Sequence, residues 1–152
     1  MNLPAIEDCL QLAAQQSSVW AVVREADEPA WVVVLEDQTL MDVRFDADDG
    51  CLHFRAELGM VSDTDQRHAI NELILRSVGV IPMPMLSLGP DHRYELLASC
   101  PADLQAPTVL AREFDHLGSQ TSLWREVIAQ PLQGSVTSKG DSTLLADFGL
   151  LA

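Results

Sequence analysis

Apolar and polar residues alternate along residues 31–58, and this alternation is the clearest structural signal in the chain. Met41, Val43 and Phe45 share one side of an extended backbone there, while charged residues occupy the other side. A period of two, carried by β-branched and aromatic residues, is typical of half-buried strands. Asp49-Gly50 matches the residue pair of a tight type I′ turn. We therefore expect an antiparallel three-stranded meander with one apolar face that must be covered.

Three further segments repeat apolar residues at steps of three and four, which predicts amphipathic helices. The first helix is expected from the N-terminus to about Gln16, and the second ends near Gly79. The third is the longest and runs from Pro107 to Pro131. In chain order, the positions on the inward faces are Leu3, Ile6, Cys9, Leu10 and Ala13; Ala69, Ile70, Leu73, Ile74 and Val78; and Leu110, Phe114, Leu117, Thr121, Trp124 and Ile128.

Two other parts of the sequence are rich in residues that favour strands. Residues 19–24 are a candidate additional strand ahead of the meander. Met83–Leu88 and Arg93–Ser99 predict a pair of strands around a turn at 89–92. Because proline cannot donate to a sheet ladder, two prolines near the start of the first of these strands indicate that it begins at a sheet edge or outside the ladder. An open edge is a place where a partner strand can add.

We expect one α+β domain over residues 1–131, built on an antiparallel twisted sheet. The 152 residues lie near the commonest size of a single domain, and 47% of them are hydrophobic, which is enough for a core. Residues 132–152 begin as a polar Gly/Ser linker and finish with several leucines and Phe148. Two interpretations of this segment stay open: a flexible terminus, or an apolar end that docks on a groove, for instance of a neighbouring chain.

The chain is strongly acidic, with 23 aspartates and glutamates against nine lysines and arginines and a formal charge of −14. Such a field repels phosphate backbones and anionic membrane surfaces, so nucleic acid and membrane insertion are not expected. It would attract a basic or neutral polypeptide. The simpler interpretation is that the acidity only keeps the protein soluble.

Cysteine spacing and the N-terminus indicate a cytoplasmic protein. The three cysteines form no CxxC pair, which opposes a disulfide framework and a zinc knuckle. The first residues carry acidic side chains where a signal peptide would carry lysine or arginine, so no export signal is expected. The apolar runs are too short to span a membrane.

No motif for catalysis, metal binding or cofactor binding stands out. The acidic run 46–50 has the wrong register for an EF-hand loop, because Asp49 lies directly before Gly50 and Glu57 falls inside a strand. The four histidines lie in different predicted elements, and Ser87 lacks the first glycine of a nucleophile elbow. The glycines are too isolated for a phosphate loop. We therefore expect no enzyme, no metal and no cofactor.

The predicted order of elements is helix, three-stranded meander, helix, hairpin and long helix. It is carried by the meander at 31–59, the helix HAINELILRSVG, the pair MLSLGPDHRYELLAS and the helix ending in SLWREVI. Together these segments, roughly residues 3–130, resemble the class I type III secretion chaperones of the Tir chaperone type. The segment INELILRS, the proline-rich strand after it and YELLAS are also similar to an uncharacterised bacterial domain family of the same fold that is linked to envelope stress.

The chaperone resemblance implies a non-catalytic homodimer that binds an unfolded segment of a secreted effector without ATP. The second helix and the neighbouring hairpin would form the subunit contact, through Ile70, Ile74, Met83, Met85 and Leu86. Helix one and the sheet would hold the partner, through Ile6, Leu10, Leu35, Met41, Val43, Phe45, Leu52 and Phe54. Each of these side chains is also a candidate for the core alone.

Two alternatives remain beside the chaperone hypothesis. The second resemblance implies a stress-associated adaptor or regulator, and a small hydrolase is a third hypothesis that no set of residues supports. Two features depart from the chaperone pattern: the extra segment at 19–24 and the apolar end of the chain. Either could cover the groove that an effector would need.

Overall fold

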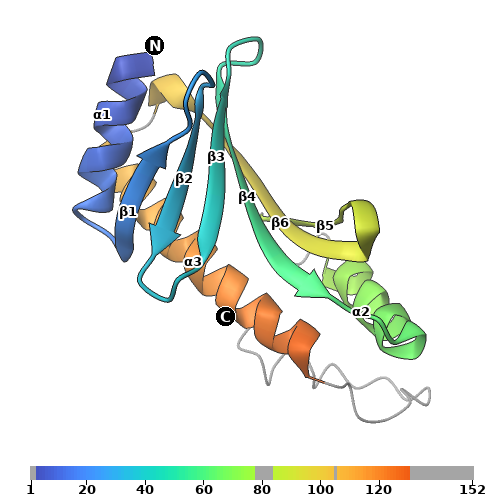
Figure 1. Ribbon diagram of the computed structural model, residues 1–152. Helices are drawn as coiled ribbons and strands as arrows, with labels where there is room; N and C mark the ends of the chain where they lie inside the picture. Colours follow the sequence, from blue (N-terminus) through green and yellow to red (C-terminus); the bar gives the residue numbers. More distant parts are fainter. Residues whose placement is uncertain (1–2, 78–83, 105, 131–152) are drawn as a thin grey trace.

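The computed structural model describes residues 3–77, 84–104 and 106–130 (Figure 1). Val78, Gly79, Met83 and the segment 132–152 lie outside these residues, and so do the predictions made for them. The elements in chain order are α1 (Leu3–Ala14), β1 (Val19–Arg24), β2 (Ala30–Leu35), β3 (Leu40–Asp46), β4 (Cys51–Met60), α2 (Thr64–Ser77), β5 (Met85–Leu88), η1 (Pro90–His92), β6 (Arg93–Pro101), η2 (Ala102–Leu104) and α3 (Pro107–Ala129).

The six strands form one antiparallel sheet in the order β1-β2-β3-β4-β6-β5. This confirms the predicted α+β fold with its antiparallel sheet, and residues 19–24 are indeed an additional strand. The proline-preceded strand β5 lies at the edge, as predicted. The sheet therefore ends in β1 on one side and in β5 on the other.

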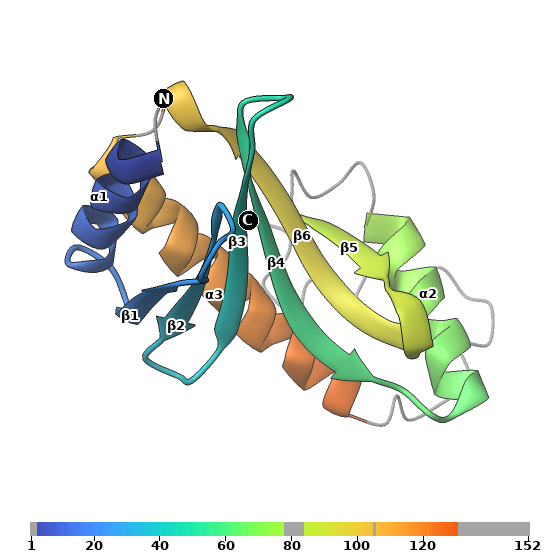
Figure 2. The ribbon, with the colours of Figure 1, turned by 45° about the horizontal axis from the view of Figure 1, so that its top comes forward.

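α1 and α3 lie against one face of the sheet, which Figures 1 and 2 show from two directions. α1 packs against β1 and α3, and α3 crosses β4. α2 lies at the far end of the long strands, where Asn71 Oδ1 accepts a hydrogen bond from the hydroxyl of Tyr94 at 2.8 Å. The core between helices and sheet contains Ile6, Leu10, Trp31, Val33, Leu35, Met41, Val43, Leu52, Phe54, Leu96, Leu110, Phe114, Leu117 and Trp124. In the described part of the chain, no helix is long and apolar enough to cross a membrane.

The inward face of α3 is the helix prediction that the structure confirms most fully. All six positions predicted for that face are buried. Phe114 meets Phe54 of β4 edge to face, with ring centroids 6.2 Å apart. The helix also approaches the sheet closely at Gly118, where an added Cβ would lie 2.7 Å from Leu35 Cδ1. A glycine inside a helix costs about 1 kcal/mol relative to alanine, and this close packing explains its presence.

α2 matches its predicted stripe less well. Of the four described stripe residues, Ile70 is fully buried, whereas Ala69, Leu73 and Ile74 are only half-buried. The next residue, Leu75, is 74% exposed. This helix therefore leaves apolar surface uncovered within the described chain.

The hairpin between β3 and β4 is confirmed, but the predicted type I′ turn is wrong. Asp46 pairs with Cys51, so four residues form the connection. A type I′ turn needs positive φ at both central residues, and in this connection only Gly50 has it, at 69°. Aspartate side chains shape the turn instead: Asp46 Oδ1 accepts from the Asp48 N–H and Asp49 Oδ1 from the Cys51 N–H, both at 2.8 Å.

Candidate functional site

The residues predicted to hold a partner lie mostly in the core. Seven of the eight are at most 3% exposed, and Phe45 is half-buried. The strands turn the buried sheet residues among them toward α1 and α3, and Ile6 and Leu10 belong to the apolar face of α1 that helps to cover them. A partner would reach them only by displacing one of these helices. The seven buried residues are Ile6, Leu10, Leu35, Met41, Val43, Leu52 and Phe54.

The residues predicted to form a subunit contact are divided between core and surface. Ile70 is buried, and Ile74 and Leu86 are half-buried at the margin of the core. Met85 on the edge strand β5 is 56% exposed. We call the exposed apolar residues of α2, β5 and the end of β4 the α2–β5 surface; they are Met60, Leu75, Met85 and Leu88.

The opposite face of the sheet carries no helix among the described residues, and it has a second exposed apolar area. The strand register arranges it in two rows across β1, β2 and β3. Ala21, Val34 and Leu40 form one row, and Val23 and Val32 begin the next, which ends at Asp42. We call the outer strip the set Trp20, Ala21, Val23, Val32, Val34 and Leu40.

Exposure in the outer strip is concentrated at three side chains. Val23 and Leu40 are each 56% exposed, and Trp20 is 77% exposed. The β1–β2 register shifts between Val19 and Ala21, so Trp20 occupies a β-bulge. Exposed apolar areas of this kind mark interaction surfaces, and tryptophan is enriched among the residues that dominate binding. None of the six strip residues is among the site residues predicted from the sequence.

Side chains of α1 partly occupy the free edge of β1. Gln11 Nε2 donates a hydrogen bond to the backbone carbonyl of Val22 at 3.2 Å. Arg24 Nη1 forms an ion pair with Glu7 of α1 at 3.1 Å. An unpaired strand edge is a template for adding another strand, and side chains that occupy its carbonyls blunt this tendency.

On β4 and β6, charged side chains of the same sheet face form ion pairs with one another. Arg55 Nη2 lies 2.5 Å from Glu95 Oε1, and the Glu95 side chain is only 10% exposed. Glu95, followed by more distant carboxylates, raises the pKa of the Arg55 guanidinium. Arg93 pairs in the same way with Glu57. These charges have partners within the chain. The most exposed apolar side chains of the outer strip, in contrast, face solvent.

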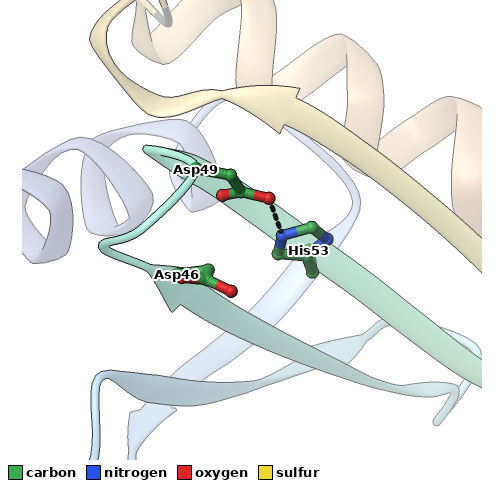
Figure 3. Close-up of side chains that lie close together, drawn as sticks. All are labelled: Asp46, Asp49 and His53. Carbon is green, nitrogen blue, oxygen red and sulfur yellow. Dashed lines mark hydrogen bonds and ion pairs between the residues drawn. The ribbon is translucent and has the colours of Figure 1, made fainter.

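Asp46, Asp49 and His53 converge at the β3–β4 hairpin (Figure 3), with candidate ligand atoms within 4.8 Å of one another. All three are solvent-accessible, and Asp49 Oδ2 lies 3.0 Å from His53 Nε2. The Cys51 N–H and then the His53 ring lower the pKa of Asp49. The contacts of Asp46 and Asp49 are those that shape the turn, so their geometry is explained without an ion.

The cysteines lie near this end of the sheet, and none is activated as a nucleophile. Burial raises the pKa of Cys100 to about 12, and the nearby Glu113 adds to this effect. Burial also raises the pKa of Cys9. The pKa of Cys51 is raised by desolvation and then by the Asp49 carboxylate. Thiols held protonated are poor nucleophiles, so they supply no nucleophilic centre near neutral pH.

Comparison with known proteins identifies the fold. No protein-family model and no curated protein sequence matches the chain. Among solved structures, a chain of the HopA1–SchA chaperone–effector complex aligns with a TM-score of 0.61 at 16% identity, over 83% of this chain and 98% of that one. This chain has the fold found in such chaperone complexes.

Two further structures support the same conclusion. A chain of the complex of the Yersinia pestis type III secretion chaperone SycH with a fragment of YscM2 aligns with a TM-score of 0.58 at 14% identity, over 77% of this chain and 97% of that one. A chain of the heterodimeric ExoU–SpcU complex from the type III secretion system of Pseudomonas aeruginosa aligns with a TM-score of 0.51 at 16% identity, over 79% and 97%. At these identities the likeness establishes the fold alone.

Proposed function

We propose that the chain is a non-catalytic, cytoplasmic protein-binding chaperone of the type III secretion class, of the class I, Tir type. It holds an unfolded segment of a secreted effector and acts as a homodimer. The observation that carries the proposal is a sheet face that bears an exposed apolar strip in a chain whose fold matches secretion chaperone complexes. Among the described residues, the ion pairs Arg55–Glu95 and Arg93–Glu57 and the raised pKa of the Cys100 thiol support a non-catalytic role.

Homodimer formation is assigned to the α2–β5 surface. Met85 and Leu75 are the most exposed apolar residues of β5 and α2; Met85 is itself predicted for the subunit contact, and Leu75 follows Ile74, which is also predicted for it. β5 is an edge strand, so a second copy can add to the sheet there or cover it with α2. Methionine adapts to irregular surfaces, which suits such a contact.

The dimer is tested by light scattering of the full chain after size exclusion. We expect a mass of twice 16.7 kDa, reduced to the single-chain value by Met85→Glu, because a carboxylate cannot be buried in an apolar contact without a large cost. Val109→Glu on α3, where Val109 is 40% exposed, is the matched control and should leave the dimer intact. A single-chain mass for the unaltered protein at all concentrations would refute the homodimer.

The chaperone role is tested by co-expression of the full chain with each protein encoded beside its gene. We expect one of them to form a stable complex in which a short segment is protected from protease while remaining extended. Binding without ATP and without turnover of the partner completes the expected result. If none of these proteins binds, or if a partner binds only as a folded domain, the proposed function is wrong.

A further inference from the structure

We propose that the outer strip binds a partner segment in which apolar residues alternate with lysine or arginine. This inference deepens the proposed function and rests on it, because the segment belongs to the client that the chaperone holds. The inference specifies which residue types the client segment presents to the outer strip.

The shape of the strip favours an extended occupant. Its two rows cross three neighbouring strands on the face that no described helix covers. An extended segment sends alternate side chains to one side, so its apolar residues can lie on the strip. The side chains between them start on the opposite side, and lysine or arginine is long enough to bend back toward the rim. Gln11 occupies the carbonyl of Val22 at the edge of β1, which favours contact with the face over simple strand addition.

The negative charge around the strip favours lysine or arginine between the apolar residues of the bound segment. Residues 1–50 hold eleven of the 23 acidic residues but only two of the nine basic ones. Both of these basic residues are already paired, Arg24 with Glu7 and Arg44 with Glu28. The first third of the chain, which forms α1 and the first three strands, is therefore a source of negative potential, which attracts cationic segments.

Two carboxylates lie at the rim of the strip itself. The Glu25 N–H bonds to the Ala30 carbonyl and the Glu36 N–H to the Ser18 carbonyl, each at 2.9 Å, so both residues continue the ladder beyond β1 and β2. Two positions after Val23 and Val34, they fall on the same face as the strip. Among the described residues, the side chains of Glu25 and Glu36 form no ion pair, and both are exposed.

Trp20 adds a second means of recognising cations. Its side chain is 77% exposed on the bulge, beside the same acidic rim. The face of an indole ring attracts lysine and arginine, and the attraction is strongest for tryptophan among the aromatic residues. An apolar and cationic segment can therefore use the ring for both kinds of contact.

Two other occupants fit less well. A second copy of this chain would bring the same uncompensated carboxylates against each other, in a protein of net charge −14. The chain's own residues 131–152 contain apolar side chains but only Lys139 as a cation, against Asp141 and Asp147. Neither supplies the alternating cations that the acidic rim calls for.

The proposal is tested with three fluorescently labelled peptides of about ten residues, long enough to follow a strand. They share alternate leucines and carry arginine, serine or glutamate between them. With the full chain we expect the arginine peptide to bind at least about tenfold more tightly than the glutamate peptide, and to weaken as salt is added. Equal binding of the three peptides would overturn the proposal.

Substitutions locate the binding. Val23→Ser and Leu40→Ser should each lower the affinity for the arginine peptide and for the serine peptide to the same extent, by about tenfold for a central contact. Glu25→Gln with Glu36→Gln should weaken the arginine peptide alone. Val109→Ser and Glu126→Gln on α3 are the matched apolar and acidic controls and should change nothing. Because all four strip and rim positions are exposed, the variants are expected to fold, and circular dichroism checks this.

The remaining outcomes separate this inference from other occupants and from the proposed function. Tighter peptide binding after Phe148→Ser would place the chain's own end on the strip, and loss of the dimer with Leu40→Ser would place a second copy there; both would overturn the inference. Gln11→Ala should leave peptide binding unchanged, and a marked gain would indicate strand addition at β1 instead. If the co-expressed partner still binds the Val23→Ser and Leu40→Ser variants as before, the inference fails while the chaperone role stands.

Discussion

Arg125 of α3 donates two hydrogen bonds to the backbone carbonyl of Glu57 in β4, from Nε at 3.0 Å and from Nη2 at 2.7 Å. The carbonyl lies beside the irregularity in the β4–β6 ladder, between Glu57 and Gly59. The same guanidinium donates from Nη1 to the buried hydroxyl of Thr39 at 2.7 Å. One side chain thus fixes the long helix to two separate parts of the sheet.

Removal of this guanidinium should destabilise the fold. Arg125→Ala leaves the Glu57 carbonyl and the Thr39 hydroxyl without their charged donor, and we expect a loss of about 1–2 kcal/mol in the free energy of unfolding. Urea unfolding followed by circular dichroism measures it. Arg112→Ala, the same substitution at an exposed position of the same helix, should cost much less. Equal losses in the two variants would show that the bonds to Glu57 and Thr39 contribute nothing.

Asp37 extends this contact and makes it depend on pH. Burial acts to raise the pKa of its carboxyl, but the Thr39 N–H, the Ser122 and Thr39 hydroxyls and the Arg125 charge together lower it below the ordinary value of 3.8. Ser122 Oγ donates to Asp37 Oδ2 at 2.8 Å. Because the pKa is lower in the folded state, the ionised carboxylate stabilises the fold above the unfolded pKa. That contribution disappears as the pH falls through the folded value.

The expected result for Asp37→Asn follows from the lowered pKa of Asp37 in the folded state. The variant should be less stable than the unaltered chain at pH 7, and the difference should shrink toward zero as the pH is lowered below 3.8. Urea midpoints at a series of pH values measure the effect. Asp8→Asn, which alters an exposed carboxylate of α1, is the control. A difference that stays constant down to low pH would show that the charge of Asp37 plays no part.

The spacing of apolar residues was enough to predict those parts of the fold in which buried and exposed positions follow the helix or strand period. The inward face of α3 and the alternation of Met41 and Val43 follow directly from helix and strand geometry, and both were confirmed. α2 was harder to predict, because its stripe is covered only in part. The turn type at Asp49-Gly50 was wrong because local aspartate side-chain bonds, and not residue preference, shape the connection.

The candidate surface was harder to predict than the fold, for a physical reason. A buried apolar side chain and a partner-binding one look the same in a sequence, so the sequence predicts partner contact for seven residues that lie in the core. Trp20 shows the opposite case: alternation counted back from Val22 would place it on the helix-covered face, but the bulge before Ala21 turns it outward. A β-bulge has no reliable signature in the sequence, and only the strand register reveals it.

Thiol labelling tests the electrostatics at the acidic hairpin. The pKa of Cys51 is raised by desolvation and then by Asp49, so its thiolate is scarce near neutral pH. We expect iodoacetamide to label Cys51 more slowly than free cysteine but faster than Cys100, whose pKa is raised to about 12. Asp49→Asn should accelerate labelling of Cys51, because it removes a negative charge that disfavours the thiolate. Labelling of Cys100 before Cys51 would contradict the structure.

Trp20 provides a direct measure of the charge around the outer strip. Trp31 and Trp124 are 1% and 3% exposed, so an added quencher should reach mainly Trp20. Near an acidic rim, caesium ions are concentrated and iodide ions are depleted at low salt. Caesium should therefore quench the accessible fluorescence more efficiently than iodide, and Trp20→Phe should remove most of the quenchable signal. Glu25→Gln with Glu36→Gln should reduce the advantage of caesium, whereas equal quenching by the two ions would show that the strip has no negative potential for a cationic segment to meet.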